Sequence, residues 1–150
     1  MARVSAYAAE HGVAIAVTRF PATTRTAQDA ARQIGCTVAE IVKSLVFLVE
    51  GAPVVVLCSG ADRVDEAKLD AALGGLGLRR ATADEAKAAT GFAIGGVPPF
   101  AHATDLRVIV DRGLLAFATV WAAAGLPDAV FPIAPAELLR LCGGQAADVT

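Results

Sequence analysis

Apolar positions along the chain follow two periods, and each period predicts a type of element. Apolar residues recur at helical spacing in segments 3–11, 26–35, 65–73, 82–91 and 135–143, and a short helical turn is expected over 38–42. A glycine ends four of these segments, as it commonly ends helices: Gly12, Gly35, Gly91 and Gly143. Thr82 to Glu85 adds a capping-box pattern. The chain is therefore expected to carry helices along its whole length.

The other apolar runs are short and rich in β-branched residues, which predicts strands at 14–20, 44–50, 53–59, 107–111, 116–124 and 129–133. The second and third runs flank Glu50-Gly51-Ala52, a hairpin signal. Segment 91–102, GFAIGGVPPFAH, is expected to be irregular because its glycines and prolines break helices and ladders. After Gly144 only a polar tail is expected. Hairpins mixed with scattered helices predict an α+β fold with a mixed sheet rather than alternating βαβ units.

Length and composition agree with one folded unit over residues 1–150. The chain is 55% hydrophobic and 19% charged, values that exclude a disordered protein. We expect a cytoplasmic protein with no membrane span, because every apolar run is shorter than about 18 residues. The beginning, MARVSAYAAEHG, has polar residues where a signal peptide would be apolar. Three cysteines without CxxC spacing indicate neither a disulfide framework nor a zinc site: Cys36, Cys58 and Cys142.

The net charge of −2 argues against a strongly basic, indiscriminate binder of nucleic acids. A local basic patch could still bind a short stretch of backbone. Arg79 and Arg80 are adjacent, and further basic residues are spread over neighbouring segments: Arg63, Lys68, Arg107 and Arg112. Because no helix-turn-helix pattern or basic face is visible, DNA is not an expected partner.

Most enzyme classes lack their residues in this chain. A hydrolase with a histidine base would have to use His11 or His102, and Ser59-Gly60 has no glycine two residues before the serine, as a nucleophile elbow requires. No HExxH motif or paired cysteines predict a metal, and GGVPP lacks the lysine of a phosphate loop. We therefore expect no metal and no cofactor.

Lys43 stands at the head of the apolar stretch IVKSLVF, although ammonium groups are costly to strip of water. Either it reaches out of the strand or it is held there for a purpose. The irregular loop is the second candidate, since its glycines let backbone N–H groups approach a ligand and its prolines stiffen the chain. From the residues alone, this loop is equally compatible with a structural turn.

Several ordered motifs together resemble the YbaK-like aminoacyl-tRNA deacylases, which are similar to the editing insertion of bacterial prolyl-tRNA synthetases. The resemblance covers about residues 23 to 147 and rests on TAQDAARQIGCTVAEIVKSLVF, ATADEAKAATGFAIGGVPPFAH, VIVD, WAAAG and PAELLRLCGG. It implies a mixed, partly barrel-like sheet surrounded by helices. It also implies hydrolysis in trans of the ester on a mischarged tRNA, most often tRNA for proline, with prolyl-tRNA synthetase as a possible partner.

The resemblance also implies site residues. Lys43 falls on the family's essential lysine in the pattern V-K-[ST]-L, with the expected role of gripping the phosphate of the terminal adenosine. Segment 95–99 matches the family's G-x-x-x-P loop, whose backbone meets the aminoacyl group, and water positioned by backbone and ribose hydroxyl would attack. His102 and Asp111 are expected neighbours of the site. The resemblance implies these residues at or near the substrate: Lys43, Gly95, Gly96, Val97, Pro98, Pro99, Phe100, His102 and Asp111.

Some points stay open at this stage. Ala101 stands where many members have glycine, so a positive φ there would strain the loop. Phe47, Val97 and Phe100 are candidates for narrowing the pocket, although each is also typical of plain core. The wrong amino acid, among alanine, cysteine, serine and threonine, is not determined. The alternatives are a non-catalytic module that binds a small amino acid, an aminoacyl-adenylate or an RNA end, and a hydrolase using Cys58 or Cys36.

Overall fold

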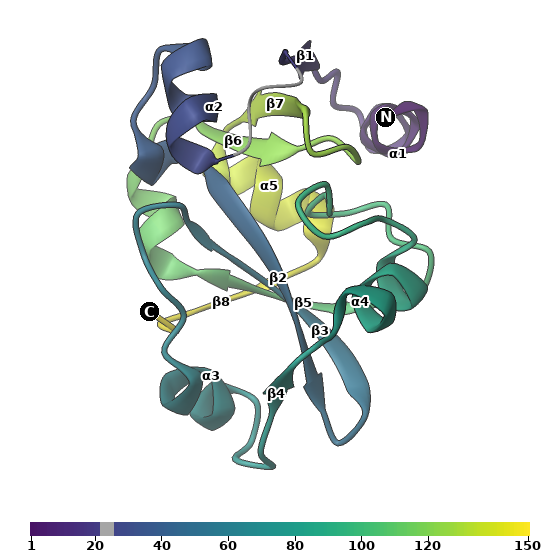
Figure 1. The fold of residues 1–150 in the computed structure, drawn as a ribbon, viewed down its shortest axis with the longest axis vertical. Coiled ribbons are helices and arrows are strands. Elements are labelled where there is room, and N and C mark those ends of the chain that lie inside the picture. The colour runs from purple at the N-terminus through teal and green to yellow at the C-terminus, as the bar shows by residue number, and fades with distance from the viewer. Residues whose placement is uncertain (22–25) are drawn as a thin grey trace.

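Two β-sheets organise the chain, and a backbone bridge between Ile41 and Trp121 joins them (Figure 1). The computed structural model describes residues 1–21 and 26–150. The helices are α1 (Ala2–Glu10), α2 (Ala27–Ile34), α3 (Glu66–Ala72), α4 (Ala83–Thr90) and α5 (Pro135–Cys142), with 3-10 turns η1 (Val38–Glu40) and η2 (Arg112–Ala116). The strands are β1 (Thr18–Arg19), β2 (Val42–Val49), β3 (Ala52–Ser59), β4 (Arg79–Arg80), β5 (Arg107–Asp111), β6 (Val120–Ala123), β7 (Ala129–Ile133) and β8 (Gln145–Ala147).

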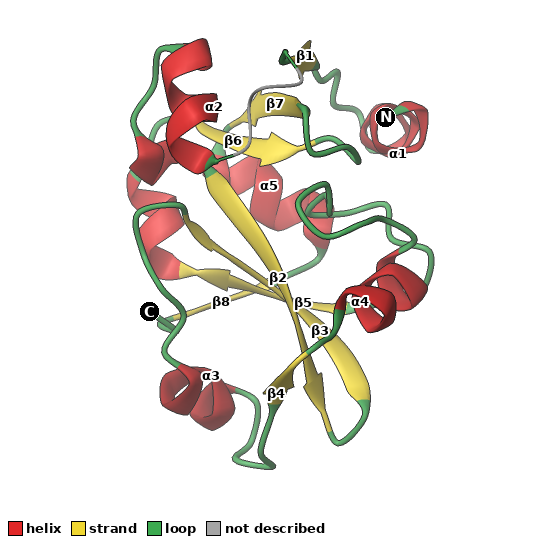
Figure 2. Ribbon diagram, in the orientation of Figure 1, coloured by secondary structure: helices red, strands yellow, loops and turns green. Residues whose placement is uncertain are grey.

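The larger sheet has the order β4-β2-β3-β5-β8 and mixes antiparallel with parallel pairs. The smaller one, β1-β7-β6, is antiparallel. Figure 2 shows the helices lying around the outside of both sheets. Because the bridge brings the edge of β2 against β6, the two sheets close part of a barrel. This confirms the expected mixed, partly barrel-like α+β fold.

The hairpin β2–β3 is the centre of the larger sheet, and its turn has the predicted sequence. Val49 pairs with Ala52, so the loop consists of Glu50 and Gly51, with φ of 50° and 80°. Two positive φ values in a two-residue loop define a type I′ turn, whose twist matches that of the flanking strands. The turn fixes the pairing register of β2 and β3, in which the side chains of Lys43 and Ser44 point to opposite faces of the sheet.

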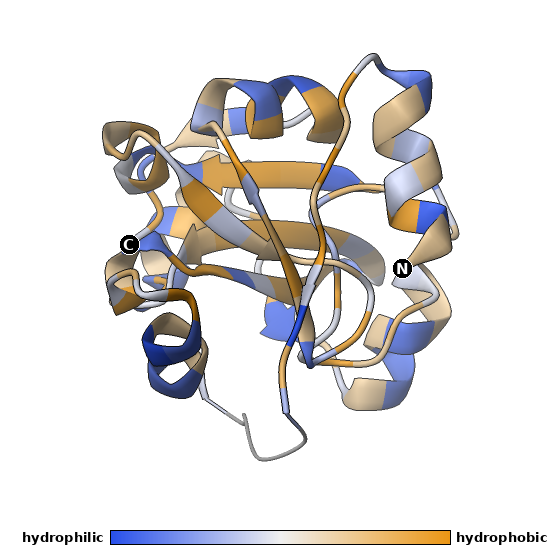
Figure 3. Ribbon diagram, turned by 90° about the horizontal axis from the view of Figure 1, so that it is seen from above, coloured by the Kyte–Doolittle hydropathy of each residue, from blue (hydrophilic) through white to orange (hydrophobic). Residues whose placement is uncertain are grey.

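Alternation along this hairpin feeds two hydrophobic clusters, one on each face of the larger sheet. Val46 and Leu48 pack into the cluster that includes α1, α5 and β6, whereas Phe47 and Val49 pack with Leu69 of α3. Figure 3 shows the apolar strands inside and polar stretches on the helices around them. Both faces of the sheet are covered, as expected of strands without a polar face. Within the described ranges, no helix is both long and apolar enough to cross a membrane.

Several elements differ from the predictions. The strand expected over 14–20 is limited to Thr18–Arg19, because only these residues find a partner, in β7. The strand expected over 116–124 is limited to Val120–Ala123, because η2 ends at Ala116 and residues 117–119 form neither helix nor strand. The polar tail after Gly144 contains strand β8, which pairs with β5, and β4 adds a short edge beside β2. Neither β4 nor β8 has an alternating hydrophobic pattern of its own. Each becomes a strand because a neighbouring strand offers backbone groups to pair with.

Candidate functional site

One edge of β2 is only partly paired. β4 pairs with one part of it and β6 is bridged near its beginning, and the pairing is interrupted between these two points. The other edge of β2 pairs with β3 along the whole strand. On the free edge, Ala81 donates to the carbonyl of Val46 at 2.9 Å, and Trp121 bridges to Ile41. Between these two points the structure, as far as it describes the chain, places no strand against β2. By alternation of the backbone groups, the amide and carbonyl of Ser44 face this interruption.

A cavity of about 200 Å³ occupies the interruption, and we call it the edge cavity. β2 forms one wall, β4 and α4 form a second, β6 contributes Ala123, and the irregular loop closes it. Its lining is mostly small and apolar: Val42, Lys43, Ser44, Leu45, Val46, Arg80, Ala81, Ala86, Ile94, Gly95, Val97 and Ala123. A cavity of this size and character suits a small side chain held against strand backbone.

Ser44 is the polar side chain of this wall. Its hydroxyl oxygen is buried and has no hydrogen-bond partner among the described residues. A buried hydroxyl without a partner is costly, so such a group commonly marks a place where a ligand or water completes the bonding. Ser44 lies in V-K-[ST]-L beside the predicted lysine, yet sequence reasoning gave it no role of its own.

Lys43 lies on the opposite face of β2 from the side chain of Ser44. Leu45 and Phe47, which point to the same face of β2 as Lys43, pack toward α3. The Nζ of Lys43 donates a hydrogen bond to the carbonyl of Asp62. The loop carrying Asp62 is tied back to the sheet, because Gly60 donates to the carbonyl of Ile41 at 2.6 Å. Lys43 therefore borders the edge cavity but extends its ammonium group to the α3 side, held by a carbonyl rather than by a carboxylate.

The irregular loop enters the site through a tight turn. The amide of Gly96 donates to the carbonyl of Ala93 at 3.0 Å, and Gly95 has a φ of 91°. This geometry at the third position of a turn requires glycine. At Gly96 a side chain would not fit, since an added Cβ would lie 2.9 Å from the Cα of Leu126. Gly95 and Val97 reach the edge cavity, whereas Gly96, Pro98 and Pro99 support the loop from behind.

His102 forms a hydrogen bond with the irregular loop and does not line the edge cavity. Its Nε2 lies 2.7 Å from the carbonyl of Pro98, and since a carbonyl only accepts, Nε2 carries the proton. Burial lowers the pKa of His102, an effect that the hydrogen bond to Pro98 opposes and the charge of Arg3 reinforces. The neutral imidazole therefore holds the proline segment in place. His102 lines a different cavity, beneath α1, and its expected place near the substrate stays a prediction.

Ala101 has a φ of 65°, so the conformation that usually calls for glycine is present. An alanine in the left-handed region costs roughly 1 kcal/mol or more. Its methyl group is buried in the main cluster, and burying one such group returns about 0.8 kcal/mol. The two contributions nearly offset, which explains how alanine is tolerated at this point of the loop.

Two aromatic candidates do not narrow the edge cavity. Phe47 points toward α3, where the guanidinium of Arg80 lies 5.8 Å from its ring centroid. Phe100 packs between Tyr7 and Phe131, with ring centroids 5.2 Å and 5.8 Å away. Neither ring lines the edge cavity, and the expected narrowing of the pocket by these residues stays a prediction. Val97 is the candidate that does line the cavity.

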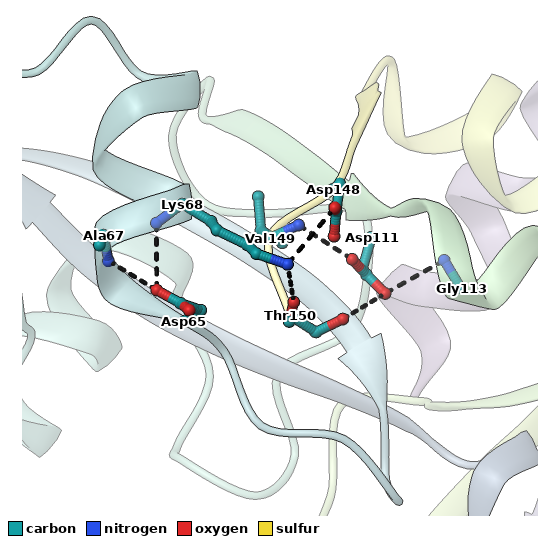
Figure 4. Close-up of polar contacts among 8 residues, drawn as sticks. All are labelled: Asp65, Ala67, Lys68, Asp111, Gly113, Asp148, Val149 and Thr150. Carbon is teal, nitrogen blue, oxygen red and sulfur yellow. Dashed lines mark hydrogen bonds and ion pairs between the residues drawn. The ribbon is translucent and has the colours of Figure 1, made fainter.

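Asp111 also lies outside the site. Its carboxylate is buried and accepts hydrogen bonds from the amides of Gly113 and Val149, at 3.1 Å each, and from the hydroxyl of Thr150 (Figure 4). Lys68, on α3, binds Asp148 and the carbonyl of Thr150 in the same cluster. Asp111 therefore fastens residues 148–150 to the end of β5, and its expected place beside the substrate stays a prediction.

The thiols do not offer a nucleophile. Cys58 pairs with Lys43 across the hairpin and is fully buried, which raises its pKa despite the nearby lysine. Burial also raises the pKa of Cys36 and Cys142. A raised pKa leaves little thiolate, the form that attacks. In the portion of the chain that the structure describes, no three histidine, cysteine or acidic side chains gather as a metal site would need.

Comparison with known proteins identifies the family of this chain. A family model described as an aminoacyl-tRNA editing domain matches residues 21–141. The chain belongs to the aminoacyl-tRNA editing domain family. It is 34% identical over 122 residues to the uncharacterized protein YwhH of Bacillus subtilis (strain 168), covering 81% of this chain and 78% of that protein. It is also 34% identical over 87 residues to a proline–tRNA ligase of Ligilactobacillus salivarius (strain UCC118), covering 58% of this chain but 15% of the ligase.

Two solved structures superpose over nearly the whole chain. One, described as a proposed trans-editing enzyme for prolyl-tRNA synthetase, is 45% identical with a TM-score of 0.94, covering 99% of this chain and 95% of that one. Another, the hypothetical protein APE2540, is 32% identical with a TM-score of 0.90, covering 98% of each chain. The mixed fold is thus shared with these proteins.

Proposed function

We propose that this protein hydrolyses the ester joining a wrongly attached small amino acid to the 3′ end of a tRNA. The edge cavity carries the proposal, because it places a small apolar space beside unpaired strand backbone, a lysine and a glycine loop. The family membership supports a tRNA ester as substrate. The similarity to proline–tRNA ligases and to the proposed trans-editing enzyme favours tRNA for proline.

In this mechanism the amino acid enters the edge cavity and its carbonyl meets the loop backbone at Gly95 and Val97. Backbone N–H groups aimed at such a carbonyl stabilise the oxyanion that forms when water attacks. Water adds to the carbonyl carbon, the bond to the ribose oxygen breaks, and that oxygen takes a proton. The products are the free amino acid and the tRNA, with no covalent intermediate on the protein.

Water is the proposed nucleophile because Ser44 lacks a base. The lining of the edge cavity contains no histidine or carboxylate. Lys43, the remaining candidate base, directs its Nζ to the carbonyl of Asp62 on the other face of β2. We assign Lys43 the binding of phosphate near the ester, where its charge fixes the substrate. A tRNA substrate would place the protein with the translation machinery of the cytoplasm, beside prolyl-tRNA synthetase.

The test is deacylation of tRNA(Pro) charged in turn with alanine, cysteine, serine, threonine and proline, by the wild type and by Lys43→Ala. We expect hydrolysis of one or two wrong esters, with proline spared. Lys43→Ala should lose about 100-fold in rate, the order of magnitude of one lost electrostatic contact in a site of this kind. Circular dichroism checks that the variant is folded.

A variant with all three cysteines replaced by serine is the control for the thiol alternative, and it should keep its turnover. Loss of turnover in the folded cysteine variant would contradict the water mechanism. If the wild type hydrolysed no ester on this or other tRNAs but bound them, the non-catalytic module would be the better account of the edge cavity.

A further inference from the structure

Residues 59–65, between β3 and α3, carry the carbonyl that binds Lys43, and we call them the support segment. Ser59 is the last residue of β3, and Asp65 caps the beginning of α3. Between them, the carbonyl of Asp62 accepts a hydrogen bond from the Nζ of Lys43. Residues 62–65 form neither helix nor strand, so the position of this carbonyl depends on how the two ends of the segment are held.

The first end of the support segment lies tightly against η1 and the start of β2. The amide of Gly60 donates to the carbonyl of Ile41 at 2.6 Å, and the hydroxyl of Ser59 donates to the carbonyl of Ala39 at 2.7 Å. An added Cβ at Gly60 would lie 2.7 Å from the carbonyl oxygen of Val38 and 3.3 Å from that of Ile41. A side chain at Gly60 would therefore push the segment away from η1, because backbone atoms cannot rotate aside.

The second end is held by the last residues of the chain. The amide of Asp65 donates to the carbonyl of Val149 at 2.8 Å, and the amide of Val149 donates to the carboxylate of Asp111 at 3.1 Å. Asp111 is buried and also accepts hydrogen bonds from Gly113 and Thr150 (Figure 4). One residue, Val149, thus connects a fixed carboxylate to the support segment.

The side chain of Lys43 depends on this segment for its direction. Within residues 1–21 and 26–150, the carbonyl of Asp62 is the one hydrogen-bond acceptor of the Nζ of Lys43, and no carboxylate forms an ion pair with it. A lysine side chain has much rotamer freedom, which a single bond to a rigid carbonyl removes. A carbonyl also leaves the charge uncompensated, and an ammonium group keeps two N–H donors after this bond.

We propose that the support segment positions Lys43 for the reaction, with Gly60 and Asp111 as positioning residues at its two ends. The effect on hydrolysis rests on the proposed function, whereas the effect on the side chain of Lys43 does not. Neither Gly60 nor Asp111 has to touch the substrate, since a shift of about 1 Å caused by a remote change can lower a rate about 100-fold.

Nuclear magnetic resonance of the lysine side chains tests the positioning without a substrate. The chain has three lysines, Lys43, Lys68 and Lys87, so the Cε signals of isotopically labelled lysine can be assigned by the loss of one signal in Lys43→Ala. We expect Gly60→Ala and Asp111→Asn to move the Lys43 signal toward that of the exposed Lys87, as the bond to the carbonyl is released. An unchanged Lys43 signal in both folded variants would overturn the proposal.

Asp70→Asn is the matched control for Asp111→Asn. The carboxylate of Asp70 also accepts a hydrogen bond from a backbone amide, that of Gly77 at 2.8 Å, but it lies on α3 outside the support segment. The Lys43 signal and the turnover should both be unchanged in this variant. A change as large as that in Asp111→Asn would overturn the proposal, because it would show no dependence on the support segment.

Turnover of the mischarged tRNA tests the consequence for the reaction. The ratio kcat/KM is measured for Gly60→Ala and Asp111→Asn, each alone and combined with Lys43→Ala. We expect each single change to lower it about tenfold, less than the loss of Lys43 itself, because the charge is kept. Combined with Lys43→Ala, each should cause little further loss, since changes that act through one residue are not additive. The same loss with and without Lys43 would overturn the positioning role.

The two measurements separate this inference from the proposed function. If the Lys43 signal moves as expected while the wild type hydrolyses no ester, the support segment positions the lysine and the deacylase proposal fails. If esters are hydrolysed but the losses persist without Lys43, the deacylase proposal stands and the positioning role fails.

Discussion

At the scale of single residues, neighbouring side chains serve opposite faces of one strand. Lys43 extends to the α3 side and Ser44 to the edge cavity, since successive residues of a strand point to opposite faces. Their different bonding indicates different roles. Lys43 already has a carbonyl partner, whereas the hydroxyl of Ser44 is buried without one.

Replacing Ser44 by alanine should therefore separate stability from activity. We expect the free energy of unfolding to stay the same or rise by roughly 1 kcal/mol, because the change removes a desolvated hydroxyl without breaking a bond. Deacylation should slow, since the substrate loses a hydrogen-bond partner. Urea unfolding and turnover of the mischarged tRNA measure the two effects.

Ser59→Ala is the matched control for this prediction. The hydroxyl of Ser59 is buried but donates to the carbonyl of Ala39 at 2.7 Å and accepts from the amide of Ala61. Its removal leaves buried groups unpaired and should cost roughly 1–3 kcal/mol. An equal loss of stability in Ser44→Ala would show that Ser44 has a partner within the fold.

At the scale of elements, the site depends on how the irregular loop packs against the turn between β6 and β7. Gly96 lies against the backbone of Leu126, too close for any side chain. The loop is thereby held over the interrupted edge of β2, with Gly95 and Val97 at the cavity. His102 fastens the following prolines from the far side through the carbonyl of Pro98.

Gly96→Ala should push the loop away from this turn. Because the added methyl would meet backbone atoms that cannot rotate aside, we expect a displacement near the reacting carbonyl and a loss of about 100-fold in kcat. Single-turnover deacylation with saturating protein measures it. Gly74→Ala is the control. Its φ of 101° also strains an alanine, but an added Cβ there would have no described atom within 4 Å apart from its chain neighbours. Turnover of this variant should therefore be unchanged. Unchanged turnover in Gly96→Ala would mean that the loop does not contact the ester.

At the scale of the whole molecule, residues far apart in sequence close the fold around buried polar groups. Asp111 at the end of β5 fastens residues 148–150, and the carbonyl of Val149 accepts from the amide of Asp65 ahead of α3. His102 joins the loop to the main core. Of these groups, His102 makes global stability depend on pH, because burial lowers its pKa in the folded protein.

Stability should fall as the pH drops below the ordinary His102 pKa of 6.5. Burial lowers the pKa of His102 in the folded protein, so the unfolded chain binds a proton that the folded protein does not. The stabilisation is complete above pH 6.5 and is lost as the pH falls toward the folded pKa. Urea midpoints from pH 7.5 to about pH 5 measure the fall, before carboxylates of ordinary pKa titrate appreciably.

His102→Gln is the matched variant, because its amide can still donate to the carbonyl of Pro98. It should show a flatter dependence over this window. Glu85 contributes little in this window. Its hydrogen bonds with Arg79 and Thr82 lower its pKa to about 2, so its stabilising effect is lost only as the pH falls below the ordinary value of 4.5. An unchanged slope in His102→Gln would assign the dependence to another group.

Features that depend on near neighbours could be predicted from the amino-acid sequence. The capping box from Thr82 to Glu85, the glycine at the end of α2 and the turn at Glu50-Gly51 all form as predicted, since each is decided within four residues. The ordered motifs also indicated the family, and with it Lys43 and the loop at Gly95. These predictions required no knowledge of how distant segments meet.

The remaining features depend on how distant segments pack together. The two-residue strand β4 and the polar strand β8 exist because β2 and β5 present edges to them, and neither has a pattern of its own. The interruption between β4 and β6 creates the edge cavity. Val97 lines this cavity, whereas Phe47, Phe100 and Asp111 do not. A local pattern reports the side of a strand on which a residue lies, but cavities arise where remote segments leave space between them.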